Sequence, residues 1–293
     1  MKITNVKNLP ESLCRALTFD AYDYENAGDI SVTGAILPPR IRQLQRRHDK
    51  EITEDVTERI WKVLGDIGHG VVQRNAPPNT FSEERLSAIV NGWKLTGKVD
   101  LMRMEGDRYA IEDFKFTSVW AVKDAKPEWE QQLNFYAWLA GQNGFDVAQL
   151  RIIAILRDWS KPRAAREKDY PQVGVVIREV PLWPPDICER NLAAALTLHQ
   201  QAQAIENDDD LPLCSEQERW TKPPVFAVKK KGRQRAIKLF ADATEAAASM
   251  VGAKDLYIEE RPGVDVRCVS YCPCKPFCSY GKALELGADE VAA

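Results

Sequence analysis

Two strand-like segments, LTGKVDLMRM and YAIEDFKFTS, carry acidic residues inside otherwise apolar surroundings, and they constrain the fold more than any other feature. Asp100 lies in the first segment, while Asp113 and Lys115 lie two residues apart in the second. This spacing places the carboxylate and the amine on one face of a strand. A buried carboxylate needs a cationic partner or a metal ion. An isolated Asp-x-Lys pair is usually an ordinary cross-strand ion pair, so the interpretation depends on the flanking segments.

Helical segments flank these strands on both sides. Residues 53–72 have apolar side chains at helical spacing, and we expect this helix to end near His69. A second helix is predicted over residues 127–143, where Gln132 and Tyr136 lie four residues apart on one face. The sequence therefore predicts a histidine-bearing helix, two acidic strands and a polar-faced helix, in that order.

The remaining pattern alternates between strands and helices and predicts the α/β (α+β) class. Turns at 91–92 and 105–107 make the first three strands an antiparallel meander. The expected strands span 85–90, 93–104, 109–117, 150–156 and 173–180, followed by a helix over 186–205. Residues 223–258 then read as a small ββαβ unit. We expect an N-terminal segment (1–30), a core (31–210), the ββαβ subdomain (215–262) and a C-terminal segment (263–293).

Charge and hydropathy exclude several classes of protein. The formal net charge is −3, which argues against globally basic binding of nucleic acid and leaves room only for local basic patches. No apolar run approaches the roughly 20 residues that a membrane helix needs. The N-terminus has no secretory pattern. We therefore expect a cytoplasmic protein without a membrane partner.

Four of the seven cysteines form a dense cluster. Cys268, Cys272, Cys274 and Cys278 fall within RCVSYCPCKPFCSYG, where two prolines keep the backbone turning. The other three, Cys14, Cys188 and Cys214, are scattered. The spacing C-x3-C-x-C-x3-C differs from the C-x2-C pairs of zinc ribbons, so the sequence predicts a metal centre without deciding between zinc and an iron–sulfur cluster.

Taken together, the ordered motifs resemble the PD-(D/E)XK nucleases of the RecB/AddB type. Within that superfamily the likeness is greatest to the CRISPR-associated RecB-like exonucleases and their phage relatives. It covers roughly residues 31–136 and resumes at the cysteine cluster. The resemblance implies a restriction-endonuclease-like core, a mixed central sheet flanked by helices, with the ββαβ unit as an insertion and the cysteine loop at the C-terminus.

The resemblance also implies roles for individual residues. His69, Asp100, Asp113 and the main-chain carbonyl of Phe114 would bind Mg²⁺ or Mn²⁺. Lys115 would position or activate the attacking water. Gln132 and Tyr136 would orient Lys115 or a DNA phosphate. Glu84, in the segment FSEERL, is a candidate for a further contact.

The cysteine pattern departs from the one that the resemblance implies. In the resembling family one cysteine precedes the histidine motif, in a Cys-Pro-Arg-like context, and three lie at the C-terminus, together holding [4Fe–4S]. The matching segment here, residues 37–40, reads LPPR and has no cysteine. Either Cys14 or Cys274 would then supply the fourth thiolate. We favour the four clustered cysteines, with zinc as the alternative to iron–sulfur.

Two basic segments are candidates for binding DNA. One is the expected helix after Pro38-Pro39, and the other is a turn between two strands of the ββαβ unit. In a chain of negative net charge, such concentrations favour contacts with phosphate. The residues are Arg40, Arg42, Arg46 and Arg47 in the first segment and Lys229, Lys230, Lys231, Arg233 and Arg235 in the second.

These features lead to one functional hypothesis and two alternatives. We expect a metal-dependent DNA exonuclease that acts on single-stranded or frayed ends, in recombination or repair of the phage or mobile-element type. A recombinase or a single-strand-binding protein would be its partner, in the host cytoplasm if the protein is phage-encoded. The alternatives are an inactive DNA-binding adaptor with the same fold and a structure-specific endonuclease.

Overall fold

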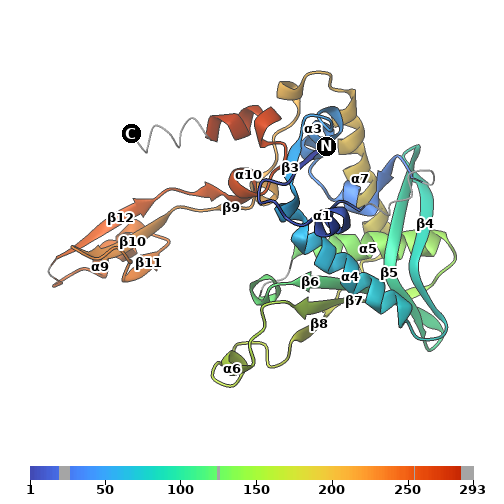
Figure 1. The fold of residues 1–293 in the computed structure, drawn as a ribbon, viewed down its shortest axis with the longest axis horizontal. Helices are drawn as coiled ribbons and strands as arrows, with labels where there is room; N and C mark the ends of the chain where they lie inside the picture. The colour runs from blue at the N-terminus through green and yellow to red at the C-terminus, as the bar shows by residue number, and fades with distance from the viewer. Residues whose placement is uncertain (20–26, 124–125, 254, 285–293) are drawn as a thin grey trace. The chain divides into compact units, whose positions relative to one another are not determined.

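The computed structural model describes residues 1–19, 27–123, 126–253 and 255–284. Its main feature is a six-stranded mixed sheet in the order β2-β5-β6-β7-β8, with β4 paired to β5 along almost its whole length (Figure 1). The pairs β2·β5 and β6·β7 are parallel, whereas β4·β5, β5·β6 and β7·β8 are antiparallel. This architecture confirms the α/β class and the predicted mixed central sheet.

The chain divides into two compact units, and each unit contains two separate stretches of the sequence. Unit 1 comprises residues 1–37 and 53–204, and unit 2 comprises residues 38–52 and 205–293. The core expected over 31–210 differs from unit 1 chiefly because residues 38–52 cluster with the C-terminal part. The same contacts place the 1–30 segment with the sheet of unit 1.

Unit 1 contains the sheet and the helices around it. Its helices are α1 (Glu11–Thr18), α2 (Val32–Ala35), α4 (Ile60–Arg74), α5 (Pro127–Gln142), α6 (Lys161–Ala164) and α7 (Pro185–Ala204). Its strands are β1 (Lys2–Thr4), β2 (Ile30–Ser31), β3 (Thr53–Asp55), β4 (Thr80–Val90), β5 (Trp93–Glu105), β6 (Arg108–Thr117), β7 (Val147–Leu156) and β8 (Val175–Val180). The predicted meander and the later strands are thereby confirmed, with small shifts in their ends.

The histidine-bearing helix differs most from its prediction. Residues Thr53–Asp55 form β3, which pairs in parallel with β1, and α4 begins only at Ile60 and runs past His69 to Arg74. A pairing with residues 2–4 lies outside any local sequence window, so helical periodicity alone extended the predicted helix too far toward its N-terminus.

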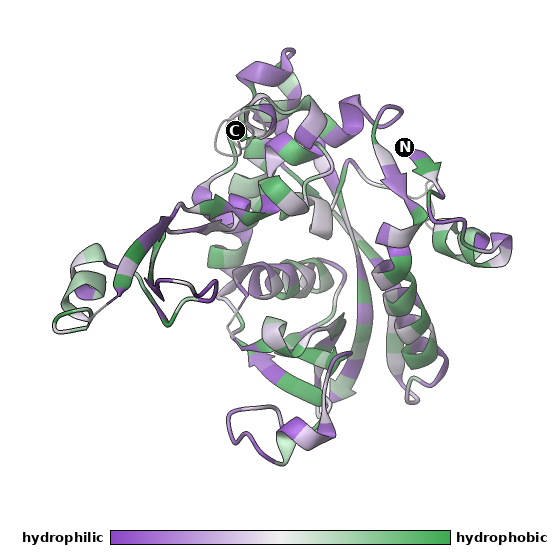
Figure 2. Cartoon of the chain, turned by 60° about the vertical axis from the view of Figure 1, so that its left-hand side comes forward, coloured by the Kyte–Doolittle hydropathy of each residue, from purple (hydrophilic) through white to green (hydrophobic). Residues whose placement is uncertain are grey.

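The core of unit 1 lies between the sheet and α5. This helix connects β6 to the parallel strand β7 and contacts β4, β5, β6 and β7. Its side chains Leu133, Phe135 and Leu139 belong to one buried cluster with sheet residues such as Ile111 and Ile152. Hydrophobic residues, green in Figure 2, run along the sheet strands beside this helix. None of the helices in the described ranges is long and apolar enough to cross a bilayer.

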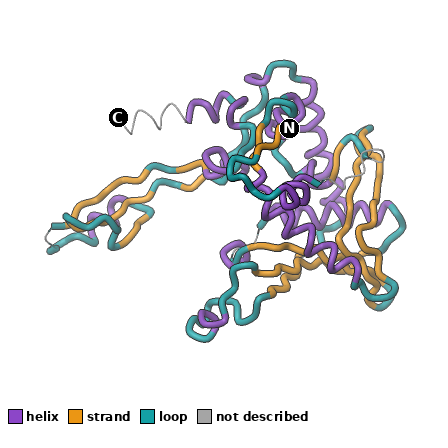
Figure 3. The backbone as a smooth tube through the Cα atoms, viewed as in Figure 1, coloured by secondary structure: helices purple, strands orange, loops and turns teal. Residues whose placement is uncertain are grey.

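Unit 2 combines one early helix with residues 205–293. Strands β10 and β12 are paired over six residues, with β11 on the free edge of β10, and β9 and β13 pair nearby (Figure 3). The predicted ββαβ unit is thereby confirmed. The helices of unit 2 are α3 (Pro39–Arg47), α8 (Glu216–Arg219), α9 (Ala243–Ala248) and α10 (Val266–Ser270), and its strands are β9 (Thr221–Lys222), β10 (Val225–Lys230), β11 (Lys238–Phe240), β12 (Leu256–Arg261) and β13 (Val264–Asp265).

Candidate metal and catalytic site

The site lies where strands β5 and β6 separate. Their antiparallel pairing ends at Leu101 and Glu112, immediately beside Asp100 and Asp113. Strand β6 continues along β7 through the pair Asp113 and Ile152, so it leaves β5 but stays in the sheet. The side chain of Asp100 fills part of the gap, because its Oδ2 accepts a hydrogen bond of 2.8 Å from the main-chain nitrogen of Phe114. The separation of the strands therefore brings both aspartates to one place.

Helix α4 brings His69 to the same place by a close contact with β6. A Cβ atom added to Gly68 would meet the ring of Phe116 at 1.9 Å, so only glycine permits this approach. The His69 ring meets the Phe116 ring edge-on, with 5.7 Å between centroids. His69 Nδ1 then lies 3.4 Å from Asp100 Oδ2.

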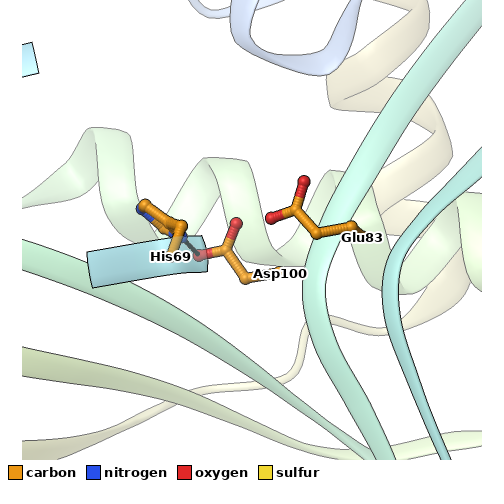
Figure 4. A group of neighbouring side chains, drawn as sticks. All are labelled: His69, Glu83 and Asp100. Carbon is orange, nitrogen blue, oxygen red and sulfur yellow. Dashed lines mark ion pairs between the residues drawn. The ribbon is translucent and has the colours of Figure 1, made fainter. Parts of the chain in front are cut away.

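Glu83 is a third candidate metal ligand, beside His69 and Asp100, and the sequence did not predict it. One ligand atom from each of His69, Glu83 and Asp100 lies within 4.8 Å of the other two, and Figure 4 shows the three side chains converging. The expected contact, Glu84, is not in this group. Glu83 has a left-handed φ of 58°, uncommon for a non-glycine residue, and no sequence signal marks it beyond two adjacent glutamates.

Asp113 and Lys115 form the second half of the site. Asp113 is 2% exposed, and its Oδ2 lies 2.6 Å from Lys115 Nζ. Lys115 Nζ also donates a hydrogen bond of 3.1 Å to Gln132 Oε1, and Gln132 Nε2 donates one of 3.4 Å to the hydroxyl of Tyr136. The structure thus brings together all five residues expected to be catalytic, although Asp113 lies outside the three-residue metal group.

Burial and crowding dominate the electrostatics of the site. Burial, together with the nearby Asp113 carboxylate, raises the pKa of Asp100 to about 7. Burial likewise raises the pKa of Asp113, against the opposing effect of Lys115. Burial lowers the pKa of His69 below its ordinary value, which favours the neutral imidazole that binds metals. A nearby divalent cation would stabilise the charged forms of these two buried, neighbouring carboxylates.

The donor set fits a hard or borderline divalent ion. Two carboxylates and one neutral imidazole are suitable ligands for Mg²⁺ or Mn²⁺. A groove of about 970 Å³ is lined by Leu101, Glu112, Phe114 and residues of the 71–81 segment, and none of the ionisable residues of the site lines it. The site itself therefore combines a possible cation position with a partly buried lysine.

This arrangement agrees with a comparison of the sequence with known families. The family model described as the PD-(D/E)XK nuclease superfamily matches residues 32–279. The chain belongs to this superfamily. Its members are typically nucleases that use divalent metal ions, and metal-dependent hydrolysis of nucleic acid is the activity that membership implies.

A solved structure titled "Crystal structure of SSO0001" is similar at 17% sequence identity and a TM-score of 0.44, covering 64% of this chain and 84% of that chain. Among curated proteins, no match to the sequence was found.

The predicted basic surfaces are only partly exposed. In α3, Arg40 is 2% exposed, and Arg47 forms an ion pair of 2.7 Å with Asp208. Arg40 is therefore not a surface residue, and the expected basic face at this position is wrong, because its guanidinium is used inside unit 2. Arg42 is partly buried and Arg46 is exposed. Near the β10 turn, Lys229 forms an ion pair of 2.7 Å with Glu259, whereas the exposed basic residues are Lys230, Lys231, Arg233 and Arg235.

The C-terminal cysteines lie in unit 2 and are not equivalent. Cys274 is fully buried and its thiol lies 3.6 Å from the carbonyl oxygen of Ile41, to which it donates. The adjacent Cys274 thiol lowers the pKa of the Cys272 thiol to about 6. Cys14 lies in α1 of unit 1, where its thiol donates to the carbonyl oxygen of Leu9. All seven cysteines are free thiols.

Proposed function

We propose that this chain hydrolyses phosphodiester bonds of DNA in a reaction that requires Mg²⁺ or Mn²⁺. The observation that carries the proposal is the grouping of His69, Glu83 and Asp100 beside the ion pair of Asp113 and Lys115. A divalent ion at such a site would neutralise charge on the scissile phosphate and acidify a water molecule. Membership of the PD-(D/E)XK superfamily supports the same reaction class.

The residues of the chain have separable roles in this proposal. Glu83, Asp100 and His69 would hold the ion, and Asp113 would assist them or hold Lys115. In the described part of the chain, two of the three N–H groups of Lys115 have partners, Asp113 and Gln132. The third remains to orient a water molecule or a phosphate oxygen. Gln132 and Tyr136 would fix the lysine in that orientation.

The proposal is tested with full-length protein and end-labelled single-stranded DNA. We expect degradation with Mn²⁺ or Mg²⁺, none with EDTA, and a loss of at least about 100-fold in rate for Asp113→Asn or Lys115→Ala. Circular dichroism spectra of the variants check that they fold. Undiminished cleavage by both variants would show that this site is not the catalytic one.

We further propose that the enzyme is an exonuclease that acts on single-stranded or frayed ends. Circular single-stranded DNA tests this point, because an obligate exonuclease leaves a circle intact. Cleavage of the circle would favour a structure-specific endonuclease. Binding of DNA without turnover in either metal would favour an inactive adaptor.

Four finer assignments are also proposals. We propose that the chain is of the RecB/AddB type, related to CRISPR-associated and phage nucleases, and that it works in recombination or repair with a recombinase or a single-strand-binding protein. We propose a cytoplasmic location. Cys268, Cys272 and Cys278 are proposed to hold a [4Fe–4S] cluster together with a fourth thiolate, with zinc as the alternative. The exposed basic residues between β10 and β11 are proposed to contact DNA phosphates.

A further inference from the structure

Cys214, which lies far from the cysteine cluster in the sequence, shares a cavity with three of its members. Within unit 2, the side chains of Cys214, Cys268, Cys272 and Cys278 line one small cavity. Each of these four cysteines is partly exposed. Cys214 precedes the capping residue of α8, and Cys268 lies in α10, so the four thiols come from two separate segments. Four thiols around one cavity are the ligand number of a tetrahedral zinc site or an iron–sulfur cluster.

Cys274, in contrast, does not line this cavity, although it lies between Cys272 and Cys278 in the sequence. Its side chain is fully buried, and its thiol donates to the carbonyl oxygen of Ile41 in α3. The cavity lining therefore distinguishes Cys274 from the other four.

Arginines surround the cavity, and one of them needs negative charge nearby. Arg40 is 2% exposed and lines the cavity. In the described ranges its guanidinium donates to Cys278 Sγ at 3.3 Å, to Ser279 Oγ at 3.1 Å and to the carbonyl oxygen of Leu211, none of which is a carboxylate. Arginine stays charged in proteins, so its burial is costly without an anion.

A thiolate centre would supply that anion. Arg219, Arg267 and Glu218 also line the cavity, which places three guanidinium groups and one carboxylate around four thiols. Arg219 has Asp265 at 3.2 Å, and the guanidinium of Arg267 lies 4.2 Å from the centroid of the Trp220 ring. Neutral thiols would not compensate Arg40, whereas thiolates that accept its N–H group would.

The separation of the sulfur atoms favours a cluster over a single ion. Among the described residues, no three cysteine sulfurs lie within 4.8 Å of one another. With Zn–S bonds of about 2.3 Å, tetrahedral zinc would hold its sulfurs only about 3.8 Å apart. An iron–sulfur cluster places several metal atoms between its thiolates and so accepts wider spacing.

We propose that Cys214, Cys268, Cys272 and Cys278 are the four ligands of an iron–sulfur cluster, and that Cys274 is a buried thiol beside it. This inference refines the thiolate centre proposed above and is independent of nuclease activity. It replaces both fourth ligands considered from the sequence, Cys274 and Cys14. In the resembling family the lone cysteine precedes the histidine motif, whereas here it would follow the whole nuclease core.

The test measures metal content in full-length protein purified without oxygen. We compare iron, acid-labile sulfide, zinc and visible absorbance per chain in wild type, Cys214→Ser and Cys274→Ser, with Cys268→Ser and Cys14→Ser as matched references. We expect Cys214→Ser to lose at least half of its iron, as Cys268→Ser does, while Cys274→Ser and Cys14→Ser keep theirs. Wild-type iron in Cys214→Ser, or zinc in place of iron in the wild type, would overturn the proposal.

A second measurement uses only wild-type protein, in case Cys214→Ser does not fold. Native protein is alkylated before and after the cluster is removed with an oxidant and a chelator, and modified cysteines are identified by mass spectrometry. We expect the four ligands to become reactive only after removal, and Cys274 to stay protected in both states. Alkylation of Cys214 while the cluster is present would contradict its role as a ligand.

Discussion

Glu83 lies opposite Asp100 in the β4·β5 pairing, and it is the position where the ladder is interrupted. The register pairs Ser82 with Leu101 and Glu84 with Val99, but it omits the pair between them. The left-handed φ of Glu83 accounts for the omission and directs its carboxylate to the group with Asp100 and His69. One residue of irregular backbone therefore contributes one third of the candidate metal group.

Glu83→Gln should weaken metal binding and activity, whereas the neighbouring Glu84→Gln should not. Loss of an outer contact to a metal ligand costs about 10- to 100-fold in affinity, and loss of a direct ligand should cost no less. Isothermal titration with Mn²⁺ and the DNA degradation assay check this result. Equal behaviour of the two variants would remove Glu83 from the site.

Gly68→Ala should destabilise α4 and displace His69, because its new methyl group would meet the ring of Phe116. Overpacking of this kind costs about 1 to 3 kcal/mol. Gly65→Ala in the same helix meets nothing within 4 Å and should be neutral or stabilising by about 0.5 to 1 kcal/mol. Thermal unfolding and Mn²⁺ titration of both variants measure the difference; the prediction fails if Gly68→Ala melts above the wild type.

In metal-free protein, the pKa of His48 should lie above 6.5 and the pKa of His69 below it. The Asp208 carboxylate, 2.6 Å from His48 Nε2, raises the pKa of His48, while burial lowers that of His69. The chain has only three histidines, so NMR signals of the imidazole protons can be followed individually. Asp208→Asn should return the pKa of His48 toward 6.5.

The same ion pair makes the stability of unit 2 depend on pH. Because the folded-state pKa of His48 is raised, its contribution is complete below about 6.5 and is lost as the pH rises through the folded value. The pair is partly exposed, so the loss should be about 1 kcal/mol or less. Thermal melting between pH 5 and pH 8 measures it, and His48→Gln should flatten the dependence.

Lys231→Ala combined with Arg233→Ala should weaken binding to single-stranded DNA. Both side chains are exposed in the turn after β10. If each contacts one phosphate, the slope of log K against log salt should fall in magnitude by about 1.4. Fluorescence anisotropy at several salt concentrations measures the slope, and Arg190→Ala, an exposed arginine in α7, is the control. An unchanged slope would leave the turn as a solubilising feature.

Local patterns in the sequence predicted most of unit 1. Apolar periodicity located α5 and β7, and the turns located the meander, because these signals lie within a few residues of each other. The two aspartates and Lys115 were found because acidic residues inside an apolar strand need a partner. The sequence also predicted His69 on a helix, but it did not predict the ends of that helix correctly.

What the sequence did not predict depends on contacts between distant residues. Glu83 enters the site through a backbone irregularity that two adjacent glutamates do not reveal. Cys214 meets the C-terminal cysteines only through folding of unit 2, and it seemed isolated by its position in the chain. Arg40 resembles the other arginines of α3 in sequence, yet it is buried, because the residues it contacts lie near positions 211 and 278.

The contacts of α3 also set an order of events during synthesis. Residues 38–52 leave the ribosome early, but the remainder of unit 2 begins only at residue 205. Until Cys278 has been translated, Arg40 lacks the thiol to which it donates, and Ile41 lacks its contact with Cys274. The nascent chain must therefore carry α3 without its final partners while more than 200 further residues are added, and a C-terminal fragment starting at residue 205 would lack one helix of its own unit.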